Sequence, residues 1–407
     1  MKKFIIVALM MSFPFFWSCG AQNSDGPKRI ELDDAEKAYV DAGNDFAFRF
    51  LARIDENEKA DWFVSPVSLQ FLLGLVLDGA AGETADEICQ TLGYPAGQSE
   101  AVDAYCRKML SSLPGLDKKT KLSLANAIFF NQQMKIQPPY KKRVEKAYDA
   151  EVESLDFSQK QASLRIINGW CSRQTNGLIP AVLDDVSPDM FAYLLNALYF
   201  KGSWMYPFKK RYTEDRTFTL ESGQEKEIPM MAKERKFSYT ENDACQVVRL
   251  PYGNGAYSMI VLLPKKGYTV SEVIKTLDAE SWKALRNSMS SRTPVDLWLP
   301  PFESKYHVKL NDILCDMGMP RSFGPMADFK PMSPDALWLS FVQQDAVIKV
   351  DEEGTEAAAI TSAGMLGATA VAEPPRIIIF HCDHPFLYLI TESSTGAILF
   401  AGKFTGK

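Results

Sequence analysis

The spacing of apolar positions differs between the two halves of the chain. In the first half, apolar residues recur mostly every three or four positions, which is the spacing of a helix with one buried face. In the second half, short alternating or continuous apolar runs between turn residues are typical of strands. No linker or repeat separates the halves, so the sequence predicts one α+β domain over residues 35–407. The expected helices cover 35–55, 69–77, 85–92, 138–150, 166–175, 270–288 and 309–317, and the expected strands include 122–130, 152–157, 191–201, 295–299 and 337–350.

One segment near the C-terminus does not fit this simple pattern. The apolar run 346–350 begins like a strand, but three acids and Gly354 then interrupt it, as at the entrance to a loop. Residues 357–372 carry no charge, and their glycines and β-branched residues disfavour a helix. As a strand, the segment would place small residues on one face, namely Thr355, Ala357, Ala359, Thr361 and Ala363. The segment is either an ordinary strand or linker, or a loop that can also become a strand.

The N-terminus has the features of an export signal. Lys2 and Lys3 precede a short apolar run, and small residues surround Cys19. We interpret residues 1–18 as a signal peptide, Cys19 as an acylated first residue that anchors the protein to a membrane, and 19–34 as a polar tether. Plain secretion with cleavage nearby is the alternative. The expected location is therefore the outer membrane or cell surface, or the extracellular space.

Composition argues against nucleic acid as the main partner and gives little indication of metal sites or disulfides. The net charge of -6 argues against nucleic acid as the main partner, and we interpret the basic triplet 209–211 as a solvated turn. Besides Cys19 there are six dispersed cysteines without metal-ligand spacing, which predicts buried free thiols rather than disulfides. We expect no metal, no cofactor and a monomer.

The sequence offers no recognisable catalytic centre. It has three histidines, His307, His381 and His384, and no nucleophile elbow, zinc motif or phosphate-binding glycine loop. Asp383 and His384 could suggest a triad, but they precede an apolar strand, and a structural role is the better interpretation. The ligands at 381–384 are too crowded for a metal site. We therefore expect that the protein is not an enzyme and that the chemistry belongs to a partner.

A series of motifs in fixed order resembles the serpins, the serine protease inhibitor family, over about 44–403. The matching segments are 64–68 (VSPVS), 79–84 (GAAGET), 124–127 (LANA), 168–170 (NGW), 175–177 (TNG), 196–204 (NALYFKGSW), 327–329 (ADF), the acidic and small residues after Val350, 383–386 (DHPF) and 395–402 (TGAILFAG). The resemblance implies a fold of three β-sheets and eight or nine helices, with an exposed reactive-centre loop at about 352–376.

The resemblance also implies a mechanism of inhibition. A protease attacks the loop and becomes acylated on it, and the freed loop then inserts as a new central strand of the largest sheet, which distorts the captured protease. Small residues at the leading end would allow fast insertion, and the hinge that this implies comprises Glu352, Glu353, Gly354, Thr355, Glu356, Ala357, Ala358 and Ala359. A bulky or charged side chain at Thr355 should slow insertion, so this hinge favours an active inhibitor. A non-inhibitory binding or structural protein with the same fold is the alternative.

Counting along the loop from Gly354 as the family does places the reactive bond at Ala368–Thr369, within the range 366–371. Small and aliphatic residues there fit elastase-like or subtilisin-like serine proteases, and papain-like cysteine proteases remain open. The expected partner is thus a protease held in a covalent acyl complex. Arg376, which follows two prolines, is a poor candidate for the cut.

Several positions depart from the family pattern. Gln344 and Asp345 stand where the family often has His-Lys, Leu178 replaces a common Lys, and Pro301 replaces a Lys that often pairs with the acid at Glu352. The resemblance further implies that a structural polar cluster at the point where the largest sheet opens comprises Ser68, Asn196 and Gln344. These departures bear on how tightly the sheet is held closed.

Overall fold

A computed structural model describes residues 26–355 and 376–407. The expected signal peptide, Cys19, the hinge residues Glu356 to Ala359 and the expected reactive bond Ala368–Thr369 lie outside the described residues. No helix in the described ranges is long and apolar enough to cross a membrane. These ranges contain nine α-helices, which are α1 (Asp34–Asn57), α2 (Pro66–Leu77), α3 (Gly82–Leu92), α4 (Ser99–Ser112), α5 (Pro138–Tyr148), α6 (Lys160–Gln174), α7 (Val270–Lys275), α8 (Ala279–Ser288) and α9 (Asn311–Asp316).

The strands form two hydrogen-bonded sheets. The six-stranded sheet has the order β10-β11-β12-β4-β2-β3, and the nine-stranded sheet has the order β1-β15-β14-β8-β7-β6-β9-β13 with β5 attached to β6. The strands are β1 (Trp62–Val64), β2 (Thr120–Asn131), β3 (Glu151–Leu155), β4 (Ala192–Ser203), β5 (Thr213–Thr219), β6 (Glu225–Glu241), β7 (Cys245–Pro251), β8 (Tyr257–Pro264), β9 (Ser290–Leu299), β10 (Phe302–Lys309), β11 (Val342–Val350), β12 (Gly354–Thr355), β13 (Ile378–His381), β14 (Phe386–Glu392) and β15 (Ile398–Phe404).

The α+β class is confirmed, but the described chain has two continuous sheets where three were expected. The cause is β6, a strand of 17 residues that pairs with β5 and β9 along most of its length and with β7 at its end. A register irregularity between Phe237 and Tyr239 marks the transition between the two pairings. Because irregularities of this kind bend a strand, one strand serves both parts and joins them.

The single helix predicted over 270–288 is wrong, since α7 ends at Lys275 and α8 begins at Ala279. Asp278 breaks the pattern because its carboxylate accepts a hydrogen bond from the backbone N–H of Ser281 at 2.7 Å, which starts a new helix. The helix α4 was not predicted at all.

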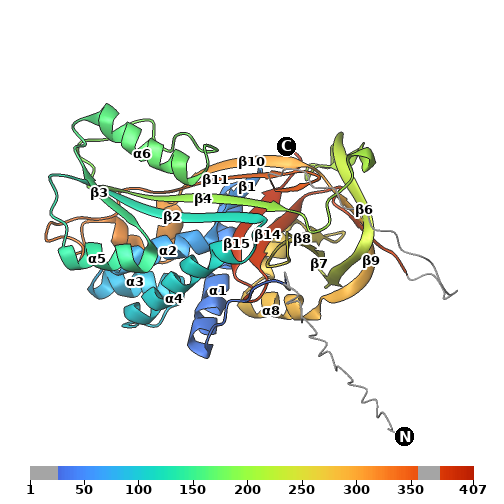
Figure 1. Ribbon diagram of the computed structural model, residues 1–407, viewed down its shortest axis with the longest axis horizontal. Coiled ribbons are helices and arrows are strands. Elements are labelled where there is room, and N and C mark those ends of the chain that lie inside the picture. The colour runs from blue at the N-terminus through green and yellow to red at the C-terminus, as the bar shows by residue number, and fades with distance from the viewer. Residues whose placement is uncertain (1–25, 356–375) are drawn as a thin grey trace, which may run out of the picture.

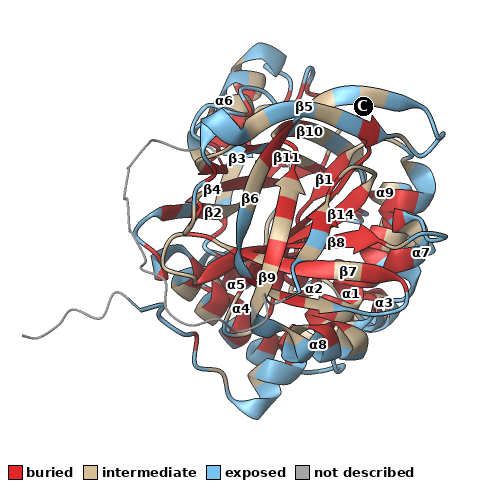
Figure 2. Ribbon diagram, turned by 90° about the vertical axis from the view of Figure 1, so that its right-hand side faces the viewer, coloured by how far each residue is buried: buried red, intermediate tan, exposed pale blue. Residues whose placement is uncertain are grey.

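The six-stranded sheet lies between two helical layers (Figure 1). On one face, α6 packs through Ile167 and Trp170 against Phe129 of β2 and its neighbours. The opposite face is covered by the helices at the N-terminal end of the chain, and buried residues run continuously from there into the nine-stranded sheet (Figure 2). The helix α2 is buried along its whole length, as its nearly continuous apolar sequence predicts, and its two polar residues Ser68 and Gln70 are buried as well.

Candidate functional site

The first residues of the hinge already lie inside the six-stranded sheet. Directly after the turn that follows β11, the short strand β12 lies between β4 and β11 and is antiparallel to both. Gly354 lies opposite Ser203, and Thr355 lies opposite Gly202 on one side and Val350 on the other. The chain has therefore already entered the six-stranded sheet at Thr355, the last residue that the structure describes before residue 376.

Gly354 is required at this entrance by geometry. Its φ of 152° lies in a region that side chains rarely adopt, and a Cβ there would stand 2.2 Å from the carbonyl oxygen of Gly202. The carboxylate of Asp351 fixes the preceding turn, because its Oδ1 accepts hydrogen bonds from the backbone N–H of Glu353 at 2.9 Å and of Gly354 at 3.2 Å.

Thr355 is fully buried on an aromatic platform. Its hydroxyl lies 2.8 Å from the hydroxyl of Tyr252, whose ring stacks on Trp204 with centroids 4.4 Å apart. The indole N–H of Trp204 donates to the carbonyl oxygen of Asp351 at 2.9 Å, so the platform also holds the turn before the hinge. Burial raises the pKa of Tyr252 well above its ordinary value, which keeps the phenol protonated and able to donate a hydrogen bond.

The hinge acids are held mainly by their backbone. The N–H of Phe208 donates to the carbonyl oxygen of Glu352 at 2.7 Å, and the N–H of Trp204 donates to that of Glu353 at 2.8 Å. The carboxylate of Glu352 accepts a hydrogen bond from the hydroxyl of Thr213 at 2.8 Å and has no ion pair with a described residue. The carboxylate of Glu353 approaches Lys210 at 4.0 Å. Since position 301 is a proline and supplies no cation, the carboxylate of Glu352 is held by a neutral hydrogen bond from Thr213 instead.

The two central strands of the sheet separate just below the hinge. The parallel strands β4 and β11 bond directly over Leu194–Ala197 and Val342–Asp345. Beyond these residues, each still pairs with its outer neighbour, β4 with β2 and β11 with β10. Within the described chain, the facing edges of residues 198–201 and 346–349 have no ladder partner. The sheet therefore opens over this stretch, between the direct pairing and β12.

Two of the three residues expected in the polar cluster lie side by side. Gln344 of β11 is in register with Asn196 of β4, and Asn196 in turn bonds the side chain of Asn126 on β2 at 2.9 Å. Gln344 also holds the backbone of Ser65 by two hydrogen bonds, of 2.7 Å and 3.0 Å. Ser68 lies one helical turn away, fully buried, and its hydroxyl has no partner among the described residues.

Several members of this site were not identified from the sequence. Tyr252 and Trp204 make the hinge platform, and Asn126 and Ser65 complete the polar row, yet none carried a role in the predicted site. A buried Asn in each of two predicted strands is the signal that could have linked Asn126 to Asn196. No local pattern marks Tyr252, because its partner lies 103 positions away.

His384 and His381 occupy structural positions, whereas the side chain of His307, which bonds Asp345 at 2.7 Å, is 60% exposed. His384 bonds Asp383 at 2.7 Å with one ring nitrogen and the carbonyl oxygen of Pro264 at 2.9 Å with the other. Burial acts to lower the pKa of His384, but these hydrogen bonds raise it above the ordinary value. His381 stacks on the ring of Trp298 and bonds Asp296 at 2.9 Å. No group of three potential metal ligands forms within the described ranges.

The six cysteines in the described ranges are free thiols, as predicted, and five of them are buried while Cys315 is partly accessible. Burial raises the pKa of Cys106 and Cys382 well above the ordinary thiol value, so both are unreactive at neutral pH.

Comparison with known proteins identifies the family. Residues 41–406 match the family model described as Serpin (serine protease inhibitor). The chain belongs to the serpin family. It is 34% identical to Iripin-3 of Ixodes ricinus over 91% of this chain and 95% of that protein, and 34% identical to Serpin B6 of Bos taurus over 90% and 99%. The structure of the thermophilic serpin tengpin in its native state matches with a TM-score of 0.83 and 28% identity, covering 93% of this chain and 96% of tengpin.

This serpin therefore belongs to a family of protease inhibitors that includes members of other function. A structure of thyroxine-binding globulin in complex with thyroxine also matches, with a TM-score of 0.80 and 28% identity over 90% of this chain and 98% of that one. Family membership alone thus supports protease inhibition in general, and the finer assignment depends on the hinge and the opening of the sheet.

Proposed function

We propose that this serpin is a suicide inhibitor that traps serine proteases by inserting its reactive-centre loop into the six-stranded sheet. The observation that carries the proposal is the docked hinge. Gly354 and Thr355 already form the first residues of an additional strand, and the sheet below them is open on both facing edges. Once a loop end is free, such a sheet could accept the strand over its open stretch, and then further as the paired edges of β4 and β11 separate.

The register of β12 predicts which residues would follow. If the antiparallel pairing of Thr355 with Gly202 and Val350 continues, Glu356 lies between Lys201 and Lys349, two lysines on neighbouring strands. Opposite charges in adjacent strands stabilise a sheet by roughly 0.2–1 kcal/mol per pair.

If it continued, the same register would place Ala357 between two buried side chains, Phe200 and Ile348. A methyl group fits between such neighbours, whereas a larger side chain would have to displace them. The small residues of the expected hinge therefore agree with the space that the open sheet offers.

We infer that the reactive bond is Ala368–Thr369 and that the target is an elastase-like or subtilisin-like serine protease. Small and aliphatic residues fit a shallow or apolar specificity pocket. Papain-like cysteine proteases form a second class to test.

The test is a gel assay with the full-length chain and an elastase-like protease. We expect a complex that survives denaturation, and mass spectrometry of the released C-terminal peptide should give the cleaved bond. Thr355→Arg should be cleaved without forming the complex, because a buried site with an aromatic floor does not accept a charged side chain. Thr219→Arg, at an exposed position of β5, is the matched control and should trap normally. Cleavage without a complex for every protease tried would contradict inhibition and favour a non-inhibitory binding protein.

We also propose that the chain is exported and anchored through an acylated Cys19. The basic start, the short apolar run and the small residues around Cys19 support this. Labelling with a fatty-acid analogue should mark the wild-type chain and leave Cys19→Ser unlabelled. If neither the wild-type chain nor Cys19→Ser is labelled, the protein is not acylated at Cys19, and plain secretion is the better interpretation.

A further inference from the structure

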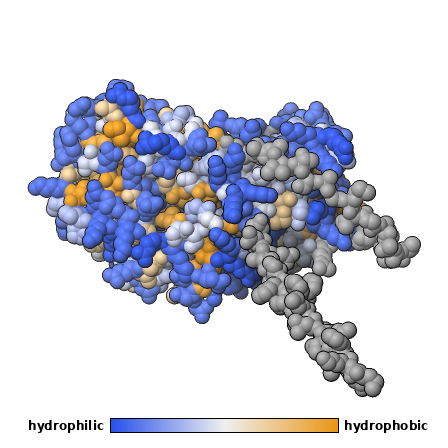
Figure 3. All heavy atoms as spheres, viewed as in Figure 1, coloured by the Kyte–Doolittle hydropathy of each residue, from blue (hydrophilic) through white to orange (hydrophobic). Residues whose placement is uncertain are grey.

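A cluster of unpaired cations lies beside the docked hinge. We call Lys209, Lys210, Arg211, Lys233 and Arg235 the basic patch. The first three follow the loop whose backbone holds Glu352 and Glu353, and the other two lie on β6. Lys233 donates a hydrogen bond to the carbonyl oxygen of Pro207, which ties β6 to that loop. This edge of the molecule lies at the right of Figure 1, far from α5, and the surface seen there in Figure 3 is largely hydrophilic.

The charges of the patch are almost uncompensated. Among the described residues, only Lys210 approaches a carboxylate, that of Glu353 at 4.0 Å, and the other four cations form no ion pair. Burial, followed by the charges of Arg235 and Lys209, lowers the pKa of Lys233 to about 8. Like charges held this close raise the free energy of the folded protein, and the protein as a whole is acidic, with a net charge of -6. The patch is thus a local concentration of positive charge on an acidic protein.

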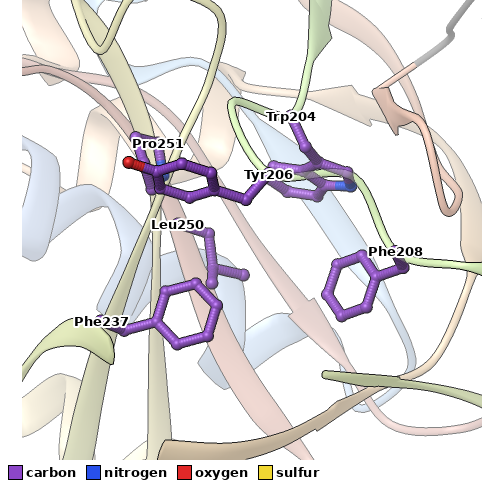
Figure 4. Close-up of a pocket in the computed structure, with 6 residues that line it drawn as sticks. All are labelled: Trp204, Tyr206, Phe208, Phe237, Leu250 and Pro251. Atoms are coloured by element: carbon purple, nitrogen blue, oxygen red, sulfur yellow. The ribbon is translucent and has the colours of Figure 1, made fainter. Parts of the chain in front are cut away.

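Aromatic rings hold these cations in place. Arg235 lies over the ring of Tyr206 at 3.4 Å and Arg211 over that of Tyr212 at 4.9 Å. Figure 4 shows Tyr206, from the loop after β4, beside a small pocket that Phe237 of β6 and Pro251 of β7 also line. Stacking on a ring leaves the edge of a guanidinium free to donate hydrogen bonds to a carboxylate.

The patch is close to both ends of the reactive-centre loop. Before the loop, the described chain ends in β12, two residues after Glu353, which Lys210 approaches. After the loop, the described chain resumes at Arg376 and enters β13. β13 pairs with β9 and β9 pairs with β6, which aligns Ile378 with Val295 and Val295 with Arg235. Two strand spacings of about 4.8 Å put Arg235 on the order of 10 Å from the returning chain. A protease that grips the loop therefore faces the basic patch.

We propose that the basic patch is a secondary docking site for the target protease, and that it selects proteases with acidic residues beside their active-site cleft. The proposal rests on the inhibitory function proposed above. The patch would raise the rate at which the first complex forms. It would leave the fate of the acyl complex unchanged, because the side chains of Lys209, Arg211 and Arg235 contact aromatic rings or solvent and form no ion pair with β4, β11 or β12. Electrostatic focusing of this kind raises association rates by about tenfold to a thousandfold, and salt reduces the effect.

The test compares the triple variant Lys209→Gln/Arg211→Gln/Arg235→Gln with wild type. Two elastase-like proteases of the same cleavage preference are used, one with an acidic and one with a basic rim. At low salt we expect the rate of covalent complex formation with the acidic protease to fall about tenfold, and the loss to shrink at 0.5 M salt. The number of serpin molecules consumed per trapped protease should not change. Lys142→Gln/Lys146→Gln on α5 is the matched control, because both lysines are exposed and unpaired among the described residues.

The outcomes separate the two proposals. If wild type traps neither protease, the inhibitory function fails. If wild type traps both and the triple variant traps the acidic protease equally fast, the docking site is refuted while the inhibitor stands. Loss of retention on a sulfated polysaccharide column with an unchanged trapping rate would also refute it and would assign the patch to a polyanion. Thermal unfolding of each variant verifies that the fold is intact.

Discussion

The hydrogen bond between Tyr252 and Thr355 should control how firmly the hinge is docked. Both hydroxyls are buried, their oxygens are 2.8 Å apart, and Thr355 is the last described residue before the open part of the sheet. Tyr252→Phe removes one partner and keeps the ring that stacks on Trp204 at 4.4 Å. Thr355→Val removes the other partner and keeps nearly the same volume.

Each single substitution leaves a buried hydroxyl without a partner, which costs about 1–3 kcal/mol. The cost falls on the docked hinge and is relieved when the hinge leaves the sheet, because the hydroxyl then meets water. The docking equilibrium should therefore shift toward release by about 5-fold to 150-fold. The double variant has no unpaired hydroxyl, so its cost should lie below that of either single variant and well below their sum.

Hydrogen exchange measured on a peptide that contains Gly354 and Thr355 reports this equilibrium directly. We expect faster exchange in both single variants and an interaction free energy of about 1–2 kcal/mol from the four proteins together. The covalent trapping assay adds a second readout, since a released hinge must dock again before insertion. If both single variants exchange as slowly as wild type, the hydroxyl pair does not hold the hinge, and the platform acts through packing alone.

Two further predictions concern the body of the fold. Lys403→Met should lower the free energy of unfolding by about 3–5 kcal/mol in urea titrations, because it removes the cation that pairs with Asp55 in an interior where these two side chains are 3% and 5% exposed. The double variant with Asp55→Asn should recover part of the loss. Burial, and then the charge of Asp103, raise the pKa of Asp78 from 3.8 to about 8. The folded state therefore holds a proton that the unfolded state releases, and stability should fall as the pH rises from about 4 to about 8. Asp78→Asn should reduce this loss, and an unchanged pH profile of the urea midpoint would refute it.

The parts of the site that depend on residue type were predictable from the sequence. Gly354 is needed where a Cβ would clash with the carbonyl of Gly202, and Thr355 is the small residue that fits a fully buried position. Both belong to one short segment in which acidic residues, a glycine and then alanines interrupt the apolar pattern of the preceding strand within a few positions. The local sequence is enough to predict these two residues, because the backbone conformation at one and the limit on side-chain size at the other apply to adjacent positions.

The parts that depend on long-range pairing were not predictable. Ser65 meets Gln344 across 279 positions, and Tyr252 meets Thr355 across 103. Neither contact leaves a periodic signal, since one polar residue in a strand looks the same whether its partner is near or far. The fusion of two expected sheets had a similar cause, because only the pairing partners of β6 show that it belongs to both.

The docked hinge and the open sheet together explain how the chain can begin insertion and not complete it. Hydrogen bonds to the backbone of Glu352 and Glu353 and the platform under Thr355 fix the entrance, while the direct pairing of β4 with β11 over Leu194–Ala197 and Val342–Asp345 keeps the far end shut. Further insertion must first separate these paired edges, which costs ladder hydrogen bonds before the incoming strand can replace them. In the proposed mechanism, β13, which pairs with β9, would anchor the far end of an uncut loop and keep it from supplying a full strand. A protease that cut the loop would remove that anchor. The unfilled edges of β4 and β11 would then supply the ladder hydrogen bonds that drive insertion.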